Sequence, residues 1–258
     1  MVDWKVTARG KKPSLKSPIL IEGLPGMGNV GKIAVDFLIE ALEAEKFLDL
    51  DSYHLPNSVF IGEDGLIEVP SISFYSKKTK KQDYLFLAGD VQPLDEVSSH
   101  AFCHKVMEIF KEFGGKEVIT LGGIGLPEAP KNPKVYLTAN DKKIKEKYSV
   151  KGVNKNIYGV VGPIIGVSGL LLGVAKKYDA PAISLLAQTF GHPNYVGVRG
   201  ARALLKALSS ALKLDVDLTD IDEEIKEMES SLRKISPLKL PKGEEKTDLY
   251  QANVSYIG

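Results

Sequence analysis

The strongest constraint on the fold is a repeated alternation of short apolar runs with longer amphipathic stretches, joined by glycines. The first apolar run, residues 19–23, is bounded by proline and glycine, which predicts a buried strand. After a glycine-rich turn, Asn29 is predicted to cap a helix whose apolar positions recur at helical spacing to about residue 45. Strand, turn and helix in this order open a βαβ unit, so the chain is predicted to form a layered α/β sheet.

The same alternation continues to about residue 214. Buried strands are predicted at 84–88, 117–121 and 182–186, with further strands at 135–139 and 158–161. Helices are predicted at 95–113, 164–178 and from 195 or 196 to 214, and a hairpin is predicted around the turn at 62–65. Residues 1–17 are polar and basic, so they are expected to form an edge segment or a loose arm.

The last forty or so residues have a different character, so three parts are predicted: a core at 1–216, an amphipathic helix at 217–236, and a linker with a tail at 237–258. The helix has a narrow apolar stripe, which is typical of a coiled-coil seam or of a helix packed against another element or subunit. Four residues of this stripe are the expected packing contacts: Ile221, Ile225, Met228 and Leu232.

Composition excludes several classes of protein. The net charge of +1 gives no field that would favour nucleic acid or an anionic membrane. The single cysteine, Cys103, forms no intrachain disulfide, and the first residues lack the apolar core of a signal peptide, so a cytoplasmic location is expected. Abundant Lys and Glu with scarce Gln and Cys indicate a thermophile.

The glycines of the first turn raise the question of a cofactor. Gly26, Gly28 and Gly31 have the spacing of a dinucleotide-binding turn, which would place a pyrophosphate at a helix N-terminus. The acid that should bind the ribose is absent, because Asp49 and Asp51 lie before a predicted strand and not at its end. A P-loop also fails, since an isoleucine follows the lysine. A packing turn is therefore favoured, and a small-molecule or nucleotide-binding enzyme that uses these glycines is the alternative.

The other chemical candidates each lack a partner. Ser168 lies in an incomplete nucleophile-elbow motif, and His192 precedes a proline in a loop. One helix carries the possible metal ligands His100, Cys103 and His104, but zinc requires a further ligand. Asp90 follows a strand, where α/β proteins keep binding residues and where loops must also turn. We therefore expect no catalytic residue, no cofactor and no metal.

Several segments together resemble the archaeal members of the proteasome assembly chaperone family. They are Gly23 to Lys32, Gly89 to Pro93, Leu121 to Gly125, Gly162 to Gly173, His192 to Tyr195 and Ala201-Arg202. The resemblance implies a three-layer α/β/α sandwich like that of nucleoside phosphorylases, without their active site. It implies a non-enzymatic, ATP-independent assembly chaperone, activator or adaptor. The implied partners are proteasome α-subunits, the core particle or a paralogous chaperone, and further copies of the chain in a ring or cage of about four or five subunits.

The resemblance also implies that the end of the sequence docks on the proteasome. Activators of the family end in a hydrophobic residue, a tyrosine and one last residue, and the tyrosine and the terminal carboxylate enter pockets between α-subunits. Here Tyr256 is third from the end and follows a serine, so the motif is shifted by one residue. Three readings stay open: a degenerate docking tail, a tail that binds its own oligomer, or an ordered terminal strand. The expected partner-binding residues are Val254, Tyr256, Ile257 and Gly258.

Overall fold

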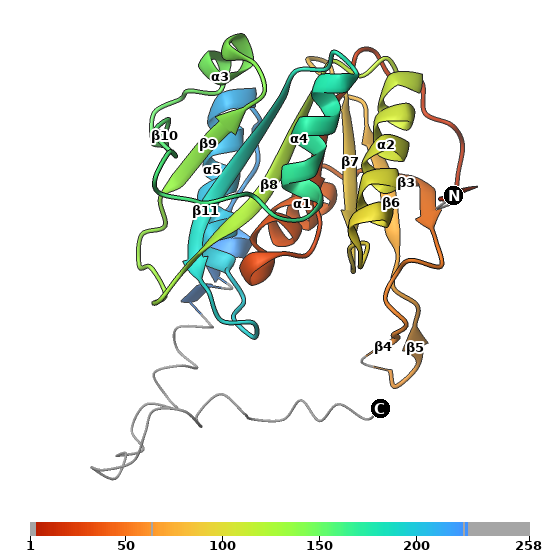
Figure 1. Ribbon diagram of the computed structural model, residues 1–258, viewed down its shortest axis with the longest axis horizontal. Coiled ribbons are helices and arrows are strands. Elements are labelled where there is room, and N and C mark those ends of the chain that lie inside the picture. Colours follow the sequence, from red (N-terminus) through yellow and green to blue (C-terminus); the bar gives the residue numbers. More distant parts are fainter. Residues whose placement is uncertain (1–3, 63, 224, 227–258) are drawn as a thin grey trace. The chain divides into compact units, whose positions relative to one another are not determined.

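The computed structural model describes residues 4–62, 64–223, 225 and 226 (Figure 1). The chain divides into two units, Met1–Leu218 and Thr219–Gly258. The first unit contains the sheet and its helices. In the second, helix is present at 219–223, 225 and 226, within the predicted helix 217–236. Ile221 and Ile225 belong to this helical segment, whereas Met228, Leu232 and the predicted tail lie outside the described residues.

The first unit is built on one large mixed sheet. Its strands lie in the order β1-β3-β6-β7-β2-β8-β11-β9-β10. Their bounds are Lys5–Ala8 (β1), Ile19–Gly23 (β2), Glu45–Asp51 (β3), Ile72–Lys77 (β6), Tyr84–Gly89 (β7), Glu117–Leu126 (β8), Val135–Ala139 (β9), Val153–Asn154 (β10) and Ala182–Phe190 (β11). The four central strands, β7-β2-β8-β11, are parallel, and antiparallel pairs flank them on both sides. Because the central strands are parallel, their carboxyl ends meet at one edge, which we call the carboxyl edge.

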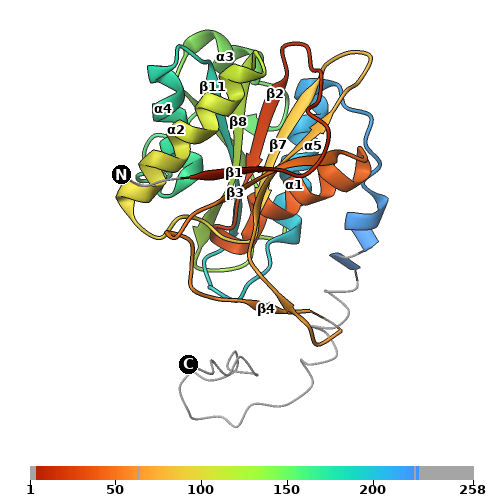
Figure 2. The ribbon, with the colours of Figure 1, turned by 90° about the vertical axis from the view of Figure 1, so that its right-hand side faces the viewer.

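Helices cover both faces of the sheet. They are Val30–Ala41 (α1), Glu96–Glu112 (α2), Lys142–Lys147 (α3), Val167–Lys177 (α4) and Val198–Leu212 (α5), and a short 3₁₀ turn, η1 (Met27–Asn29), precedes α1. Helices α1 and α5 pack together on one face and α2 with α4 on the other, whereas α3 packs beside β9 (Figure 2). The α/β/α sandwich predicted from the resemblance is confirmed.

A large buried cluster lies between the sheet and the α2–α4 layer. Phe102 and Phe110 of α2 are fully buried in it, together with Leu20 from β2 and Leu171 from α4. Strand β2 is buried at every position, as expected for a central strand with helices on both faces. Its sequence, however, includes a glutamate, Glu22, in a place where apolar residues are the rule.

Three local predictions were wrong. Strand β3 was missed because Glu45–Asp51 alternates charged and apolar residues, as a strand near a sheet edge does. Residues 158–161 form only an isolated bridge, since their side chains lack a buried face. Helix α4 begins at Val167 and not at 164, because Gly166 has a φ of 89°, which ends the preceding loop outside helical geometry.

The predicted hairpin is present but short. It consists of β4 (Phe60–Ile61) and β5 (Ile67–Glu68), which pair with each other and form a sheet of their own. It lies in the connection between β3 and β6, and Figure 1 shows it projecting away from the main sheet at the carboxyl edge. The predicted N-terminal edge segment became β1, which pairs only with β3.

Candidate functional site

The carboxyl edge of the sheet contains a cavity of about 260 Å³. Segments far apart in the sequence line it: the turn after β2, the end of β8, Gln92 after β7, and the approach to α4. Most of the lining is aliphatic, with backbone of Gly26, Gly122 and Gly123 and the side chains of Gln92 and Ser168. A crevice at the carboxyl ends of parallel strands is the usual place for a ligand in an open α/β sheet.

The glycines of the first turn are required for packing. A Cβ on Gly31 would overlap the carbonyl oxygen of Leu121, so only glycine lets α1 approach β8 this closely. Gly28 has a φ of 61° and lies against the side chain of Thr189. Gly26 has an extended backbone, and a Cβ there would make only an ordinary contact with Gln92 Nε2 at 4.0 Å. Two of the three predicted glycines therefore hold helix and strands together.

Asn29 occupies the N-cap position of α1, but the predicted side-chain cap is absent. Its φ of 51° is left-handed, and its side chain accepts no hydrogen bond from the first turn. Its backbone N–H instead donates to the carbonyl of Gly26 at 2.9 Å. The turn is thus closed by backbone hydrogen bonding, and asparagine fits because it tolerates left-handed geometry better than most residues.

Gln92 connects two walls of the cavity. Its Nε2 donates to the carbonyl of Pro25 in the first turn, and its Oε1 accepts the backbone N–H of Val167 at 3.0 Å. The amide therefore caps α4 from outside the helix, since Gly166 at the N-cap position has no side chain to do so. The sequence indicated this loop as a possible binding element; in the described structure its polar groups serve to fix the fold.

A buried carboxyl group lies behind the cavity. Glu22 is fully buried, and its Oε1 accepts hydrogen bonds from the N–H of Leu24 at 3.1 Å and from the hydroxyl of Ser168 at 3.2 Å. Its Oε2 has no hydrogen-bond partner in the described residues. Burial raises the pKa of Glu22 to about 8, although the two hydrogen bonds act to lower it. Glu22 is therefore protonated at neutral pH.

Ser168 is a helix-start residue that supports this carboxyl group. Its hydroxyl lies near Glu22 and, at 3.5 Å, the carbonyl of Leu121, and neither partner is a base that would activate a nucleophile. The sequence motif around Ser168 gave no sign of Glu22. The sequence feature that indicates a buried carboxyl group is Glu22 itself, the single charged residue inside the apolar run 19–23.

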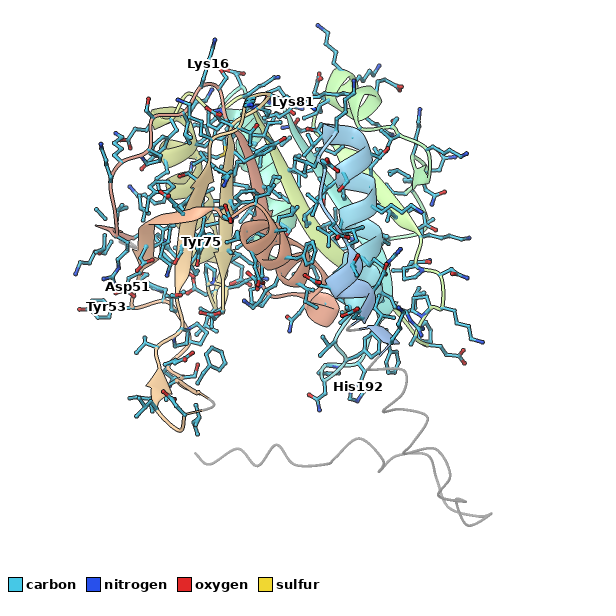
Figure 3. All side chains as sticks on the ribbon, turned by 180° about the vertical axis from the view of Figure 1, so that it is seen from behind. Lys16, Asp51, Tyr53, Tyr75, Lys81 and His192 are labelled. Atoms are coloured by element: carbon cyan, nitrogen blue, oxygen red, sulfur yellow. The ribbon has the colours of Figure 1, made fainter. Side chains whose placement is uncertain are left out.

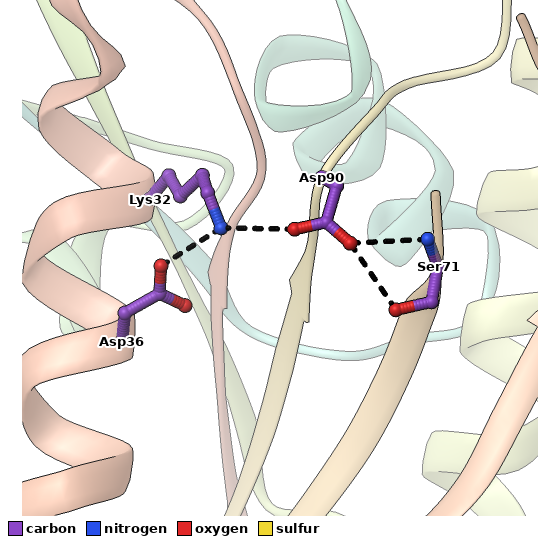
Figure 4. A network of polar contacts seen from close by, with 4 residues as sticks. All are labelled: Lys32, Asp36, Ser71 and Asp90. Atoms are coloured by element: carbon purple, nitrogen blue, oxygen red, sulfur yellow. Dashed lines mark hydrogen bonds and ion pairs between the residues drawn. The ribbon is translucent and has the colours of Figure 1, made fainter. Parts of the chain in front are cut away.

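A second group of polar contacts at the carboxyl edge joins side chains of α1 to the loop after β7 and to the residue before β6. Lys32 Nζ lies 2.9 Å from Asp36 Oδ2 and 3.4 Å from Asp90 Oδ1 (Figure 4). Asp90 Oδ2 accepts the N–H and the hydroxyl of Ser71, at 3.1 and 3.2 Å. Burial acts to lower the pKa of Lys32, but the two carboxylates outweigh it and the pKa is raised. The amine is thus a charged structural tie between α1 and β7.

The structure changes the reason for rejecting a dinucleotide site. Asp49 and Asp51 lie in β3, with Asp51 as its last residue, so the predicted position before a strand was wrong. Strand β3 is nevertheless separated from β2 by β6 and β7, which places both acids far along the sheet from the glycine turn. The carboxylate of Asp49 is also engaged, by Arg9 and by the hydroxyl of Ser73.

The candidate metal ligands do not converge. Cys103 is buried, and burial together with the charge of Glu22 raises the pKa of its thiol. His104 forms a 3.0 Å contact with the hydroxyl of Tyr178, and His100 is exposed. In the described part of the chain, no three His, Cys, Asp or Glu side chains are grouped to hold a metal. His192 is half-buried and stacks on Phe190, in the loop before α5.

Exposed apolar side chains gather at the carboxyl edge. Among the described residues, most of the large ones lie in the hairpin, in the first turn of α2, or in the connections that follow β2, β3, β7, β10 and β11. The hairpin has the densest group, with Val59, Ile61, Leu66, Ile67 and Val69 each more than half exposed. Within the described residues, no helix is both long and apolar enough to cross a bilayer. Surfaces of this kind suit contact with protein.

Comparisons with known proteins decide the family. A model of the PAC2 family matches residues 20–236. The chain belongs to the PAC2 family. An uncharacterized protein of Methanocaldococcus jannaschii is 30% identical over 221 residues, covering 86% of this chain and 84% of its own length. The likeness to archaeal proteasome assembly chaperone homologues, predicted from the motifs, is confirmed by the solved structures.

Two solved structures from Pyrococcus furiosus are similar over most of this PAC2 chain. PbaB, described as an archaeal proteasome activator, has a TM-score of 0.82 at 33% identity and covers 91% of this chain and 99% of its own. PbaA, described as an archaeal homolog of proteasome-assembly chaperone, has a TM-score of 0.72 at 27% identity, covering 89% and 91%. The likeness extends well beyond single motifs, and both structures are described as proteasome-related proteins.

Proposed function

We propose that this PAC2 protein is a homo-oligomeric, ATP-independent assembly chaperone or activator that binds proteasome subunits or the core particle in the cytoplasm. The observation that carries the proposal is the likeness to PbaB, which spans 91% of this chain at 33% identity. The geometry of the carboxyl edge supports a role in binding and not in catalysis. Its glycines pack against strands, and the side chains of Gln92, Lys32 and Asp90 are used to hold the fold.

We place the contact with the proteasome in the last residues of the sequence, Val254, Tyr256, Ile257 and Gly258. Tyrosine is the natural anchor because its ring buries a large rigid surface while its hydroxyl stays hydrogen-bonded. An oligomer would present several such segments at once, and the effective concentration of the second would strengthen weak individual contacts. The apolar stripe of Ile221, Ile225, Met228 and Leu232 would contribute to packing between subunits.

The test compares peptide hydrolysis and co-sedimentation with the archaeal core particle for three proteins. They are the wild type, Tyr256→Ala, and the matched control Tyr250→Ala, which removes a tyrosine from the same part of the sequence. We expect Tyr256→Ala to lose most of the binding and the control to keep it. Equal binding by all three would reject the role of Tyr256, and no binding by the wild type would reject the proteasome as partner.

The alternative is a small-molecule or nucleotide site at Gly26, Gly28 and Gly31, and the cavity of about 260 Å³ beside this turn is the observation in its favour. A ligand at about 100 times its dissociation constant adds about 2.7 kcal/mol to stability. Nucleotides at millimolar concentration should therefore raise the melting temperature by several degrees if the alternative is right. We expect no shift, and a clear shift with one nucleotide would favour the alternative.

A further inference from the structure

The hairpin of β4 and β5 exposes an apolar face that has no partner within the described residues. In the hairpin, Phe60 lies opposite Glu68 and Ile61 opposite Ile67. Since side chains alternate along a strand, Ile61 and Ile67 share one face, and the flanking residues Val59 and Val69 continue it. The exposed fractions of these four side chains are 51% for Val59, 79% for Ile61, 71% for Ile67 and 76% for Val69.

The two faces of the hairpin differ in charge. The face of Ile61 and Ile67 carries only β-branched aliphatic side chains, whereas Glu68 and Phe60 lie on the opposite one. A partner of complementary charge would be drawn to the Glu68 face. The aliphatic face instead matches a surface that is equally flat and uncharged, and an identical hairpin related by a two-fold axis supplies such a surface.

The hairpin is also too small to be stable alone. Its ladder contains two residue pairs, and it forms no strand pairing with the main sheet. A two-stranded hairpin is at best marginally stable in water, and three or more strands or a packed face are needed to hold it. Within the hairpin, the turn is closed by the N–H of Gly62 donating to Leu66 and by Asp64 accepting from Leu66.

The area of this face sets the scale of the contact. Exposed valine and isoleucine side chains offer roughly 100–130 Å² each, so the four together supply on the order of 300 Å² per copy. A stable interface needs about 800 Å² on each partner. Other exposed apolar side chains of the same edge can supply the remainder, since Tyr53, Leu94 and Val97 are each at least 68% exposed. The backbone N–H of Leu94 lies 3.4 Å from the carbonyl of His54, which joins these positions to the base of the hairpin.

We infer that the Val59–Ile61–Ile67–Val69 face is a subunit interface, in which the hairpins of two copies of this chain pack face to face about a two-fold axis. The inference rests on the homo-oligomeric part of the proposed function and names the surface that forms it. Ile61 of one copy then lies near Ile61 and Ile67 of the other. The interface is separate from the sequence segments proposed to contact the proteasome.

The first experiment measures assembly by analytical ultracentrifugation over a wide range of concentrations. The double substitution Ile61→Lys with Ile67→Lys places two charges on each face and so four across the interface, and we expect it to weaken self-association about 100-fold or more. Val6→Lys makes the same change at a 44% exposed valine on β1, and Glu68→Lys changes the opposite face of the hairpin. We expect both controls to assemble as the wild type does.

The second experiment uses cysteine cross-linking, which is practicable because the native Cys103 is buried. Ile61→Cys should form a covalent dimer under mild oxidation, and Glu68→Cys, on the other face, should not. Far-ultraviolet circular dichroism checks that each variant is folded. Cross-linking of both variants to the same extent would indicate random collision and would overturn the inference.

The outcomes separate the inference from the function it rests on. If the wild type assembles and the lysine variant assembles equally well, the hairpin interface is wrong while the homo-oligomer stands. If the wild type is monomeric at every concentration, both are wrong. If the lysine variant keeps its assembly but loses binding to the core particle, the face contacts the proteasome and not a second copy, which also overturns the inference.

Discussion

The two edges of the central sheet differ in almost every respect. At the carboxyl edge, glycine turns and exposed apolar side chains surround a cavity, and the buried acid there, Glu22, accepts a hydrogen bond from Ser168. At the amino edge the loops are tighter and rich in exposed lysines, as Lys16 and Lys81 illustrate in Figure 3, where Tyr53 and His192 lie at the opposite end. A buried acid of that edge, Glu117, is paired with Lys147 and Tyr148.

The comparison indicates that the amino edge is adapted to solvent and the carboxyl edge to contact with another protein. A solvated lysine-rich edge resists association, whereas an apolar edge favours it. Glu22 and Glu117 show the same division. Glu117 is satisfied by partners from its own edge, whereas Glu22 depends on protonation and on a residue from α4. Substitutions at the two edges should therefore differ in size and in pH dependence.

The largest effect is expected where α1 meets β8. Gly31→Ala forces a methyl group into the carbonyl of Leu121, which backbone atoms cannot avoid cheaply. We expect a loss of about 3 kcal/mol or more in the free energy of unfolding, measured by urea denaturation. Gly173→Ala is the matched control, because nothing lies within 4 Å of its Cβ in α4, and it should gain about 0.5–1 kcal/mol. Similar losses in both variants would show that close approach is not the reason for Gly31.

A smaller effect, with a pH signature, is expected at Glu22. The unfolded chain ionises this group near 4.5, whereas the folded protein keeps the proton up to about 8. Folded protein therefore binds more protons between these values, and its stability falls as pH rises through the window. Glu22→Gln should remove this slope and be more stable than the wild type at pH 8 by about 2 kcal/mol, as measured by thermal unfolding at several pH values.

Ser168→Ala sharpens the same prediction. The serine hydroxyl lowers the pKa of Glu22, so its removal should raise the pKa and extend the falling part of the stability curve to higher pH. Identical pH profiles for the wild type and Glu22→Gln would contradict the buried, protonated state of Glu22. An unchanged profile in Ser168→Ala alone would show that the hydroxyl contributes little.

At the amino edge, the informative change is Tyr148→Phe. Its hydroxyl donates to Glu117 at 2.5 Å in a buried setting, and a hydrogen bond to a charged group contributes about 1.5–3 kcal/mol. We expect a loss of about 1.5 kcal/mol by urea denaturation, because Lys147 still pairs with Glu117. Tyr53→Phe, at a fully exposed tyrosine, should leave stability unchanged. If Tyr148→Phe leaves stability unchanged, Lys147 alone accounts for the stabilisation of Glu117.

The smallest effect is expected from the exposed lysines. Lys80→Ser and Lys81→Ser remove charge from a solvated turn of the amino edge, and each should change stability by less than about 0.5 kcal/mol. Sedimentation should show the same assembly as the wild type. A change in assembly as large as that of the hairpin substitutions would end the functional distinction between the two edges.

The sequence predicted the layers better than the contacts. The runs that became β2, β7, β8 and β11 are mostly apolar without alternation, and this pattern predicts strands that are buried on both faces. The helix predicted at 95–113 became α2, and Asp95 at its N-cap accepts the N–H of Ser98 at 2.8 Å in a capping box. Local signals of this kind depend on neighbours in the sequence, and sequence alone is enough to find them.

The roles of individual side chains that depend on the order of strands in the sheet could not be predicted. The role of Gln92 requires the turn after β2 and the start of α4 to lie on either side of it, and nothing in its own loop shows this. The same holds for Glu22, whose partner Ser168 is 146 residues away. Strand β3 was missed because its alternating charges matched no buried-strand pattern, although pairing with β1 and β6 stabilises it. Such roles emerge only after distant segments have met.

The position of β11 has a consequence for how the protein is made. This strand is the last of the sheet in sequence, yet it lies between β8 and β9 and pairs with both. During synthesis, β8 and β9 leave the ribosome long before the strand that joins them, so the sheet has an open slot until residues 182–190 emerge. A chain stopped before that point retains an unpaired edge on its central strand. The loops of the carboxyl edge thus reach their working arrangement only after residues 182–190 have been made.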